Sequence, residues 1–191
     1  MGMTGLTQQP PYRTNPATRS LRLQLWGYAR RPNTPALLEW QDALSTLCAA
    51  HSLKGITLRF SPVLTGANAC AIPEAQGILL SEELVHRIKD PDERRGLLAH
   101  ELAHILLRNV DDPSPDAEYD ADTVALQLLG EKEPLKSGLI HLARLCDEET
   151  RKALQSRIRS IADQPIPTGH LLGSVITTHH LAHIPIPSRG R

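Results

Sequence analysis

Residues 97–106 read LLAHELAHIL, which places His100 and His104 four residues apart within an apolar sequence. This pattern predicts a buried helix, and residues four apart on a helix lie on the same face. Two imidazoles at that spacing can bind one Zn²⁺, while Glu101 lies beside the metal without serving as a ligand. Its carboxylate can take a proton from zinc-bound water and pass it to a leaving amine. The HExxH pattern therefore predicts a metal-binding helix with Glu101 as the catalytic general base and acid.

A catalytic zinc site needs a third protein ligand and an open position for water. Glu118 lies 14 residues after His104 (118 − 104), early in the next expected helix, and Asp122 follows one helical turn later. We expect Glu118 to be the third ligand. Asp122 would accept a hydrogen bond from the free ring nitrogen of a ligand histidine, which fixes its tautomer. Asp116 and Asp120 are rival ligands, for which we expect exposure to solvent.

These motifs resemble the HtpX-type and CAAX-prenyl-protease-type zinc metallopeptidases, a gluzincin family. Residues 98–104 (LAHELAH) are similar to the metal helix of that family, and residues 118–122 (EYDAD) to its downstream motif, in which the first Glu is the third zinc ligand. Residues 71–81 resemble the strand above the family's active site, where an extended substrate pairs through its backbone. The resemblance covers about residues 55–130 and implies a zincin-like domain with one Zn²⁺ per chain.

The sequence departs from that family in two ways. Many members are integral membrane enzymes, but no stretch here approaches the ~18–20 apolar residues of a membrane span. The connection from His104 to Glu118 is also short, as in the minimal soluble members called minigluzincins. This compact pattern overlaps with the ImmA/IrrE-like regulatory proteases, which cleave a repressor partner. A third alternative is a non-catalytic zinc-binding interaction protein, against which the presence of Glu101 argues.

The order of patterns along the chain predicts an α+β domain, with strands first and helices afterwards. Residues 1–20 read as a disordered N-terminal arm, 21–163 as the peptidase domain and 164–191 as a loosely structured tail rich in Pro and His. Caps followed by proline indicate three helix starts. We expect a small, mostly antiparallel sheet packed on the HExxH helix and the Glu118 helix. The expected strands are 21–25, 56–60, 69–73 and 77–81, and the expected helices are 35–52, 82–88, 91–108, 115–129, 134–145 and 148–162.

The composition fits a single domain of 191 residues with balanced charge, since Lys plus Arg and Asp plus Glu both total 21. That balance argues against a nucleic-acid-binding protein, which normally has a basic excess. Cys48, Cys70 and Cys146 form no CxxC pair, so neither a disulfide framework nor a cysteine zinc site is indicated. The N-terminal sequence lacks the apolar core of a secretory signal, and we expect a cytoplasmic protein.

A zinc hydrolase also needs a donor for the oxyanion of the tetrahedral intermediate. Tyr119, His141, Arg144 and Arg157 are candidates among which the sequence does not choose. For the histidines at 179, 180 and 183, the alternatives are a second metal site, a segment that folds over the cleft and, the reading we favour, a functionally quiet tail. Taken together, the sequence predicts a zinc metalloendopeptidase that hydrolyses a peptide or protein substrate, with no indication of its oligomeric state.

Overall fold

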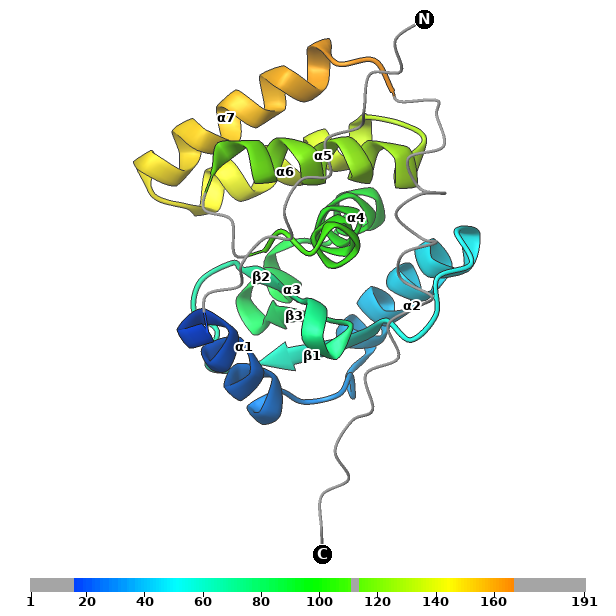
Figure 1. The fold of residues 1–191 in the computed structure, drawn as a ribbon, viewed down its shortest axis with the longest axis vertical. Coiled ribbons are helices and arrows are strands. Elements are labelled where there is room, and N and C mark those ends of the chain that lie inside the picture. Colours follow the sequence, from blue (N-terminus) through cyan, green and yellow to red (C-terminus); the bar gives the residue numbers. More distant parts are fainter. Residues whose placement is uncertain (1–15, 111–113, 167–191) are drawn as a thin grey trace, which may run out of the picture.

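The computed structural model describes residues 16–110 and 114–166, and Figure 1 shows their arrangement. The elements are, in chain order, α1 (Pro16–Tyr28), α2 (Pro35–Ala50), β1 (Thr57–Ser61), β2 (Ala69–Ile72), the 3₁₀ turn η1 (Pro73–Ala75), β3 (Gly77–Ser81), α3 (Glu82–Arg87), α4 (Pro91–Leu107), α5 (Pro115–Leu129), α6 (Glu133–Leu145) and α7 (Glu148–Asp163). Within this part of the chain, no helix is both long enough and apolar enough to cross a membrane.

Helix α4 forms the centre of the fold. In Figure 1 it is seen nearly end-on, between the sheet on one side and α5, α6 and α7 on the other. It packs most extensively on α6 and α5, and its opposite side contacts α2, β2 and β3. This position explains its apolar sequence, because Leu98, Leu102 and Ile105 are fully buried between these layers. The Glu118 helix, α5, therefore packs chiefly on the HExxH helix.

The sheet has three strands in the order β1-β3-β2. Strand β3 is buried along its whole length and pairs with β1 in parallel and with β2 in antiparallel orientation. The short η1 connection between β2 and β3 turns the chain back, which makes that pair antiparallel, as expected for 69–73 and 77–81. The sheet is thus mixed, and the expectation that it is mostly antiparallel is wrong for the β1–β3 pair. The mostly helical fold with a small sheet agrees with the helices expected after residue 81.

Helix starts were well predicted by caps followed by proline. The Thr34 hydroxyl accepts a hydrogen bond from the Leu37 amide, the Asp90 carboxylate from those of Asp92 and Glu93, and the Ser114 hydroxyl from Ala117. Each side chain satisfies an amide that the first helical turn leaves without a partner. Helices α2, α4 and α5 begin directly after these caps, as expected. Helix α5 also ends at Gly130, whose left-handed conformation suits a residue without a side chain.

The expected strand at residues 21–25 is wrong, because these residues belong to helix α1. The alternating leucines suggested a strand, but Leu21 and Leu23 are 57% and 40% exposed. The side chains that face the protein are Arg22, Leu25 and Trp26, which have helical spacing. Arg22 is only 5% exposed and pairs with Glu74 at 3.4 Å. Helix α1 begins within the expected N-terminal arm, of which residues 1–15 lie outside the described part, as do residues 167–191 of the expected tail.

Glycines allow α4 and α6 to approach closely. A Cβ added to Gly96 of α4 would lie 2.6 Å from the backbone nitrogen of Leu135 and would overlap the Pro134 carbonyl. On the facing helix, a Cβ at Gly138 would meet the Leu97 side chain at 3.0 Å and the Glu93 carbonyl at 3.1 Å. This close contact fixes α6, which forms one wall of the cavity described below, against the helix that carries HExxH.

Candidate metal centre

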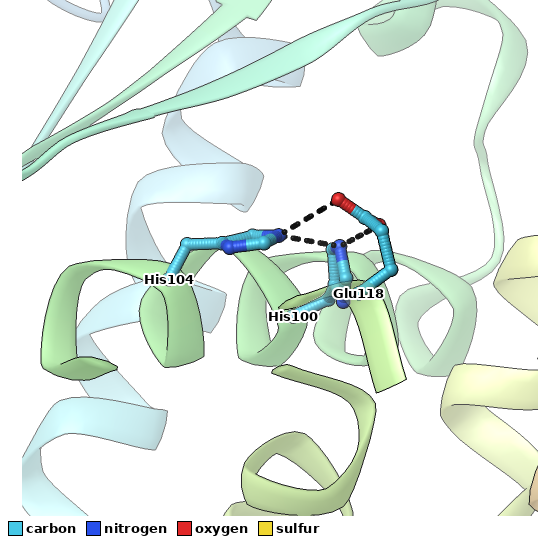
Figure 2. Close-up of side chains that lie close together, drawn as sticks. All are labelled: His100, His104 and Glu118. Carbon is cyan, nitrogen blue, oxygen red and sulfur yellow. Dashed lines mark hydrogen bonds and ion pairs between the residues drawn. The ribbon is translucent and has the colours of Figure 1, made fainter. Parts of the chain in front are cut away.

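The two histidines of HExxH lie on one face of α4, separated by a single turn. His100 and His104 are both buried, and their Nε2 atoms are 3.1 Å apart. Figure 2 shows both imidazoles directed toward the carboxylate of Glu118. Helical spacing alone thus brings two imidazole nitrogens to the same point.

Glu118, near the start of α5, brings the third donor to this point. Its Oε2 lies 3.3 Å from Nε2 of His100 and its Oε1 lies 3.4 Å from Nε2 of His104. One donor atom from each of the three residues can be chosen so that all lie within 4.8 Å of one another. Donors bound to one tetrahedral Zn²⁺ at about 2.0–2.1 Å lie about 3.3–3.4 Å apart. Two imidazoles and one carboxylate at these spacings therefore fit a zinc site with three protein ligands.

The outer nitrogen of each histidine is held by a buried polar side chain. Nδ1 of His100 lies 3.0 Å from Oδ1 of Asp122, the residue one turn after Glu118. Nδ1 of His104 lies 2.8 Å from Oδ1 of Asn109, and the Asn109 amide in turn donates to the Ala117 carbonyl at 3.1 Å. A proton on each Nδ1 leaves the Nε2 lone pairs directed at the centre. The geometry expected for Asp122 is present, whereas Asn109 was missed because nothing in its local sequence indicates a contact with His104.

Arg157 of α7 closes the cluster on the side of the carboxylates. Its Nε and Nη2 donate to the two oxygens of Asp122 at 2.8 and 2.7 Å, and its Nη1 lies 2.7 Å from Oε2 of Glu118. Its Nη2 also lies 3.1 Å from Nδ1 of His100, which packs the guanidinium against that ring. One arginine thus contacts two carboxylates and one histidine of the centre.

These contacts perturb the proton affinities of the centre. Burial and Arg157 lower the pKa of His100, but hydrogen bonds to Asp122 and Glu118 outweigh them and raise this pKa to about 9. Burial raises the pKa of Glu118, but hydrogen bonds with both histidines hold it well below its usual range. Burial likewise raises the pKa of Asp122, and its bonds to Arg157 and His100 hold it below the usual value. Both carboxylates are therefore ionised at neutral pH, which favours a cation at the centre.

The cluster forms part of the wall of a cavity of about 300 Å³. Glu101 and Arg157 also line this cavity, and residues 67–71 border it from the edge of the sheet. The rest of the wall is largely aliphatic and is formed by Leu84, Leu97, Val110, Leu139, Leu142 and Leu154. The cavity therefore joins a cluster of candidate metal donors and a carboxylate to a largely apolar wall.

Of the four candidate oxyanion donors, Arg157 alone is among the residues that line this cavity. His141 instead pairs with Glu93 at 2.8 Å, and the Tyr119 hydroxyl bonds to Ser156 at 2.9 Å. Arg144 lines a separate groove between α6 and α7. The rival ligands Asp116 and Asp120 are exposed, as expected, and the histidines at 179, 180 and 183 lie outside the described residues.

Residues 52–111 match the family model described as peptidase family M48. The matched segment contains the sheet, α3 and α4 with both histidines, and it ends before Glu118, Asp122 and Arg157. No curated protein matches the chain, and no solved structure does so. The matched family implies metallopeptidase activity, in agreement with the donor cluster. The matched segment comprises 60 of the 191 residues (111 − 52 + 1), and the comparison shows that this segment is similar to peptidase family M48.

Proposed function

We propose that this protein is a zinc-dependent endopeptidase with a zincin-like fold. His100, His104 and Glu118 hold the metal, Glu101 is the general base and acid, and Asp122 orients His100. The observation that carries this proposal is the meeting of the two helices: α4 supplies the histidines, α5 supplies Glu118, and their donor atoms lie within 4.8 Å of one another.

The formal charges of the centre support a divalent ion. With both histidines neutral, as when they bind a metal, Glu101, Glu118 and Asp122 contribute three negative charges and Arg157 one positive charge, so the net formal charge is −2. A dication neutralises this charge, whereas like charges held so close together otherwise repel one another. In the metal-free chain, the raised pKa of His100 reflects the same demand for a cation. Neutral imidazoles together with a carboxylate suit Zn²⁺ better than the hard ions Mg²⁺ and Ca²⁺.

Zinc at this position would lower the pKa of a water molecule to near 7 and polarise a scissile carbonyl. The chain's own residues supply the remaining functions. Glu101 lines the same cavity as both histidines, so its carboxylate is placed to accept a proton from the attacking water and to transfer it to the leaving amine. The aliphatic part of the cavity would receive a side chain of the substrate, while water is excluded from the reacting atoms.

Metal content and peptide cleavage test this proposal together. We expect about one zinc per wild-type chain and loss or marked weakening of binding in Glu118→Ala. Asp116→Ala is a matched control, because Asp116 lies on the same first turn of α5 but is exposed to solvent. A folded wild-type protein that binds no metal would refute the proposal.

Glu101→Gln separates an enzyme from a non-catalytic zinc protein. The amide retains the size of the carboxylate but cannot accept the proton, so we expect normal zinc content and loss of cleavage of a peptide library. Cleavage that persists in this variant would contradict the role of Glu101. Wild-type protein that binds zinc without cleaving any peptide or protein would favour the non-catalytic alternative.

A further inference from the structure

We propose that Arg157 is a positioning residue of the metal centre, which holds Oε2 of Glu118 so that Glu118 offers only Oε1 to the metal. This inference rests on the proposed function. Arg157 lies 46 residues beyond the end of the segment that matches the family model (157 − 111), on a helix that the match does not include.

The guanidinium has a fixed orientation because Asp122 binds it at two points. Nε and Nη2 donate to Oδ2 and Oδ1 of Asp122 at 2.8 and 2.7 Å, which is the paired geometry that makes arginine–carboxylate contacts strong and directional. The side chains of Arg157 and Asp122 are only 11% and 2% exposed, so little solvent competes for these bonds. Once these two nitrogens are engaged, Nη1 remains as the donor for a further acceptor.

That acceptor is Oε2 of Glu118, at 2.7 Å from Nη1. The other oxygen, Oε1, lies 3.4 Å from Nε2 of His104, and Oε2 lies 3.3 Å from Nε2 of His100, so both oxygens have the spacing of donors on one tetrahedral zinc. The contact with Arg157 distinguishes them, because it is made to Oε2. An oxygen held by a guanidinium is a poor second donor to the same metal, since two cations would share its lone pairs. Glu118 then occupies one coordination position, and a further position stays open for water, as a catalytic zinc site requires.

Helix α7 is attached to α5, the helix that carries both carboxylates. The Ser156 hydroxyl bonds to Tyr119 at 2.9 Å, and the Gln164 amide donates to the Thr123 hydroxyl at 2.9 Å. One contact lies beside Arg157 and the other at the C-cap of α7, and together they attach α7 to the helix that carries Glu118 and Asp122. A lysine at this position would carry the same charge but would lack the planar fork that binds both carboxylates at once.

Cobalt substitution tests this role independently of activity. We compare wild type, Arg157→Ala, Arg157→Lys and Arg159→Ala, each loaded with Co²⁺ in place of zinc. Arg159 is a matched control, because it lies two residues further along α7, is exposed, and donates from Nε to the Gln155 carbonyl of its own helix. When Glu118 is free to bind through both oxygens, the coordination number rises, and the visible absorption of Co²⁺ weakens.

We expect the weaker absorption and about 10–100-fold lower metal affinity in Arg157→Ala, as for the loss of other groups that orient metal ligands. The kcat for a cleaved peptide should fall with little change in KM. Added guanidinium ion should restore part of the wild-type spectrum and rate in Arg157→Ala. The Arg157→Lys variant should retain only part of the wild-type spectrum and rate. Arg159→Ala should match wild type in every measurement.

Equal spectra and metal affinities for Arg157→Ala and Arg159→Ala would overturn the inference. If Arg157→Ala does not fold, Arg157→Lys decides, since it keeps the stem and the charge, and an unaltered Co²⁺ spectrum in that variant would equally refute the role. Failure of the proposed function is distinguishable from both results, because the wild-type protein would then bind no Co²⁺ or would bind it without cleaving any substrate.

Discussion

Replacement of Gly96 by alanine should destabilise the protein, although alanine is the better helix former. Gly96 lies within α4, where the added Cβ would be 2.6 Å from the Leu135 nitrogen, against about 3.4 Å for an ordinary contact. The two helices would have to separate by at least 0.8 Å at this point (3.4 − 2.6). The obstructing atoms belong to the backbone of α6, so no side-chain rotation relieves the clash.

The magnitude follows from two opposing terms. Overpacking against a rigid neighbour costs about 3 kcal/mol, the upper part of the usual range. The higher helix propensity of alanine stabilises the helix by about 1 kcal/mol relative to glycine. The net loss of about 2 kcal/mol corresponds to a fall in Tm of about 4–8 °C for a chain of this size. Movement of α6 would also shift Leu139 and Leu142, which line the cavity, relative to the histidines of α4.

Gly27→Ala is the matched control, because Gly27 is also helical but an added Cβ there meets no atom within 4 Å. That variant keeps only the gain in propensity and should be more stable, by up to about 1 kcal/mol. Thermal and urea unfolding of the two metal-free variants, followed by circular dichroism, measure both effects. A Gly96→Ala protein as stable as Gly27→Ala would refute the packing argument.

Three further predictions concern the centre and its cavity. Asp122→Asn should weaken zinc binding about 10–100-fold in a chelator competition, because the amide nitrogen that replaces one carboxylate oxygen cannot accept a hydrogen bond and would face a donor of Arg157 or His100. Exposed Asp120→Asn is the control, and equal affinities would contradict the role of Asp122. In the metal-free chain, the raised pKa of His100 means that its ion pairs stabilise the fold fully below about pH 6.5 and that this stabilisation is lost as pH rises through about 9. Unfolding of wild type and His100→Gln from pH 6 to 10 measures this loss, which should be absent from the variant. A peptide-library digest should show aliphatic residues next to the cleaved bond, since leucines dominate the apolar wall, and a preference for charged residues there would contradict this assignment of the cavity.

Much of the fold was predictable because the relevant signals are local. The caps at Thr34, Asp90 and Ser114 place the starts of three helices by hydrogen bonds that span only two or three residues. The error at α1 arose because leucines that alternate in sequence also fit a helix whose apolar positions are partly exposed. Its docking is decided by tertiary contacts: Arg22 pairs with Glu74, and an added Cβ at Gly77 would overlap the Trp26 ring. The parallel β1–β3 pairing likewise depends on strands that are distant in sequence.

The cluster of candidate metal donors and its contact with Asp122 were predictable for the same reason, whereas the positions of Asn109 and Arg157 beside it were not. His100 and His104 lie four apart, as do Glu118 and Asp122, so helical periodicity alone brings each pair to one face. Asn109 and Arg157 reach the cluster only because α5 and α7 pack where they do.

The contacts of Arg157 with Asp122 and Glu118 favour the ionisation of both carboxylates. Two carboxylates side by side repel each other and would favour protonation or exposure to water. Arg157 bonds to both and so allows Asp122 to remain ionised while almost fully buried. An ionised Asp122 then accepts from Nδ1 of His100 and leaves Nε2 of that ring for the metal. The motifs HELAH and EYDAD thus specify the candidate donor atoms, whereas the contact between α5 and α7 helps to hold the carboxylates of Glu118 and Asp122 ionised and oriented.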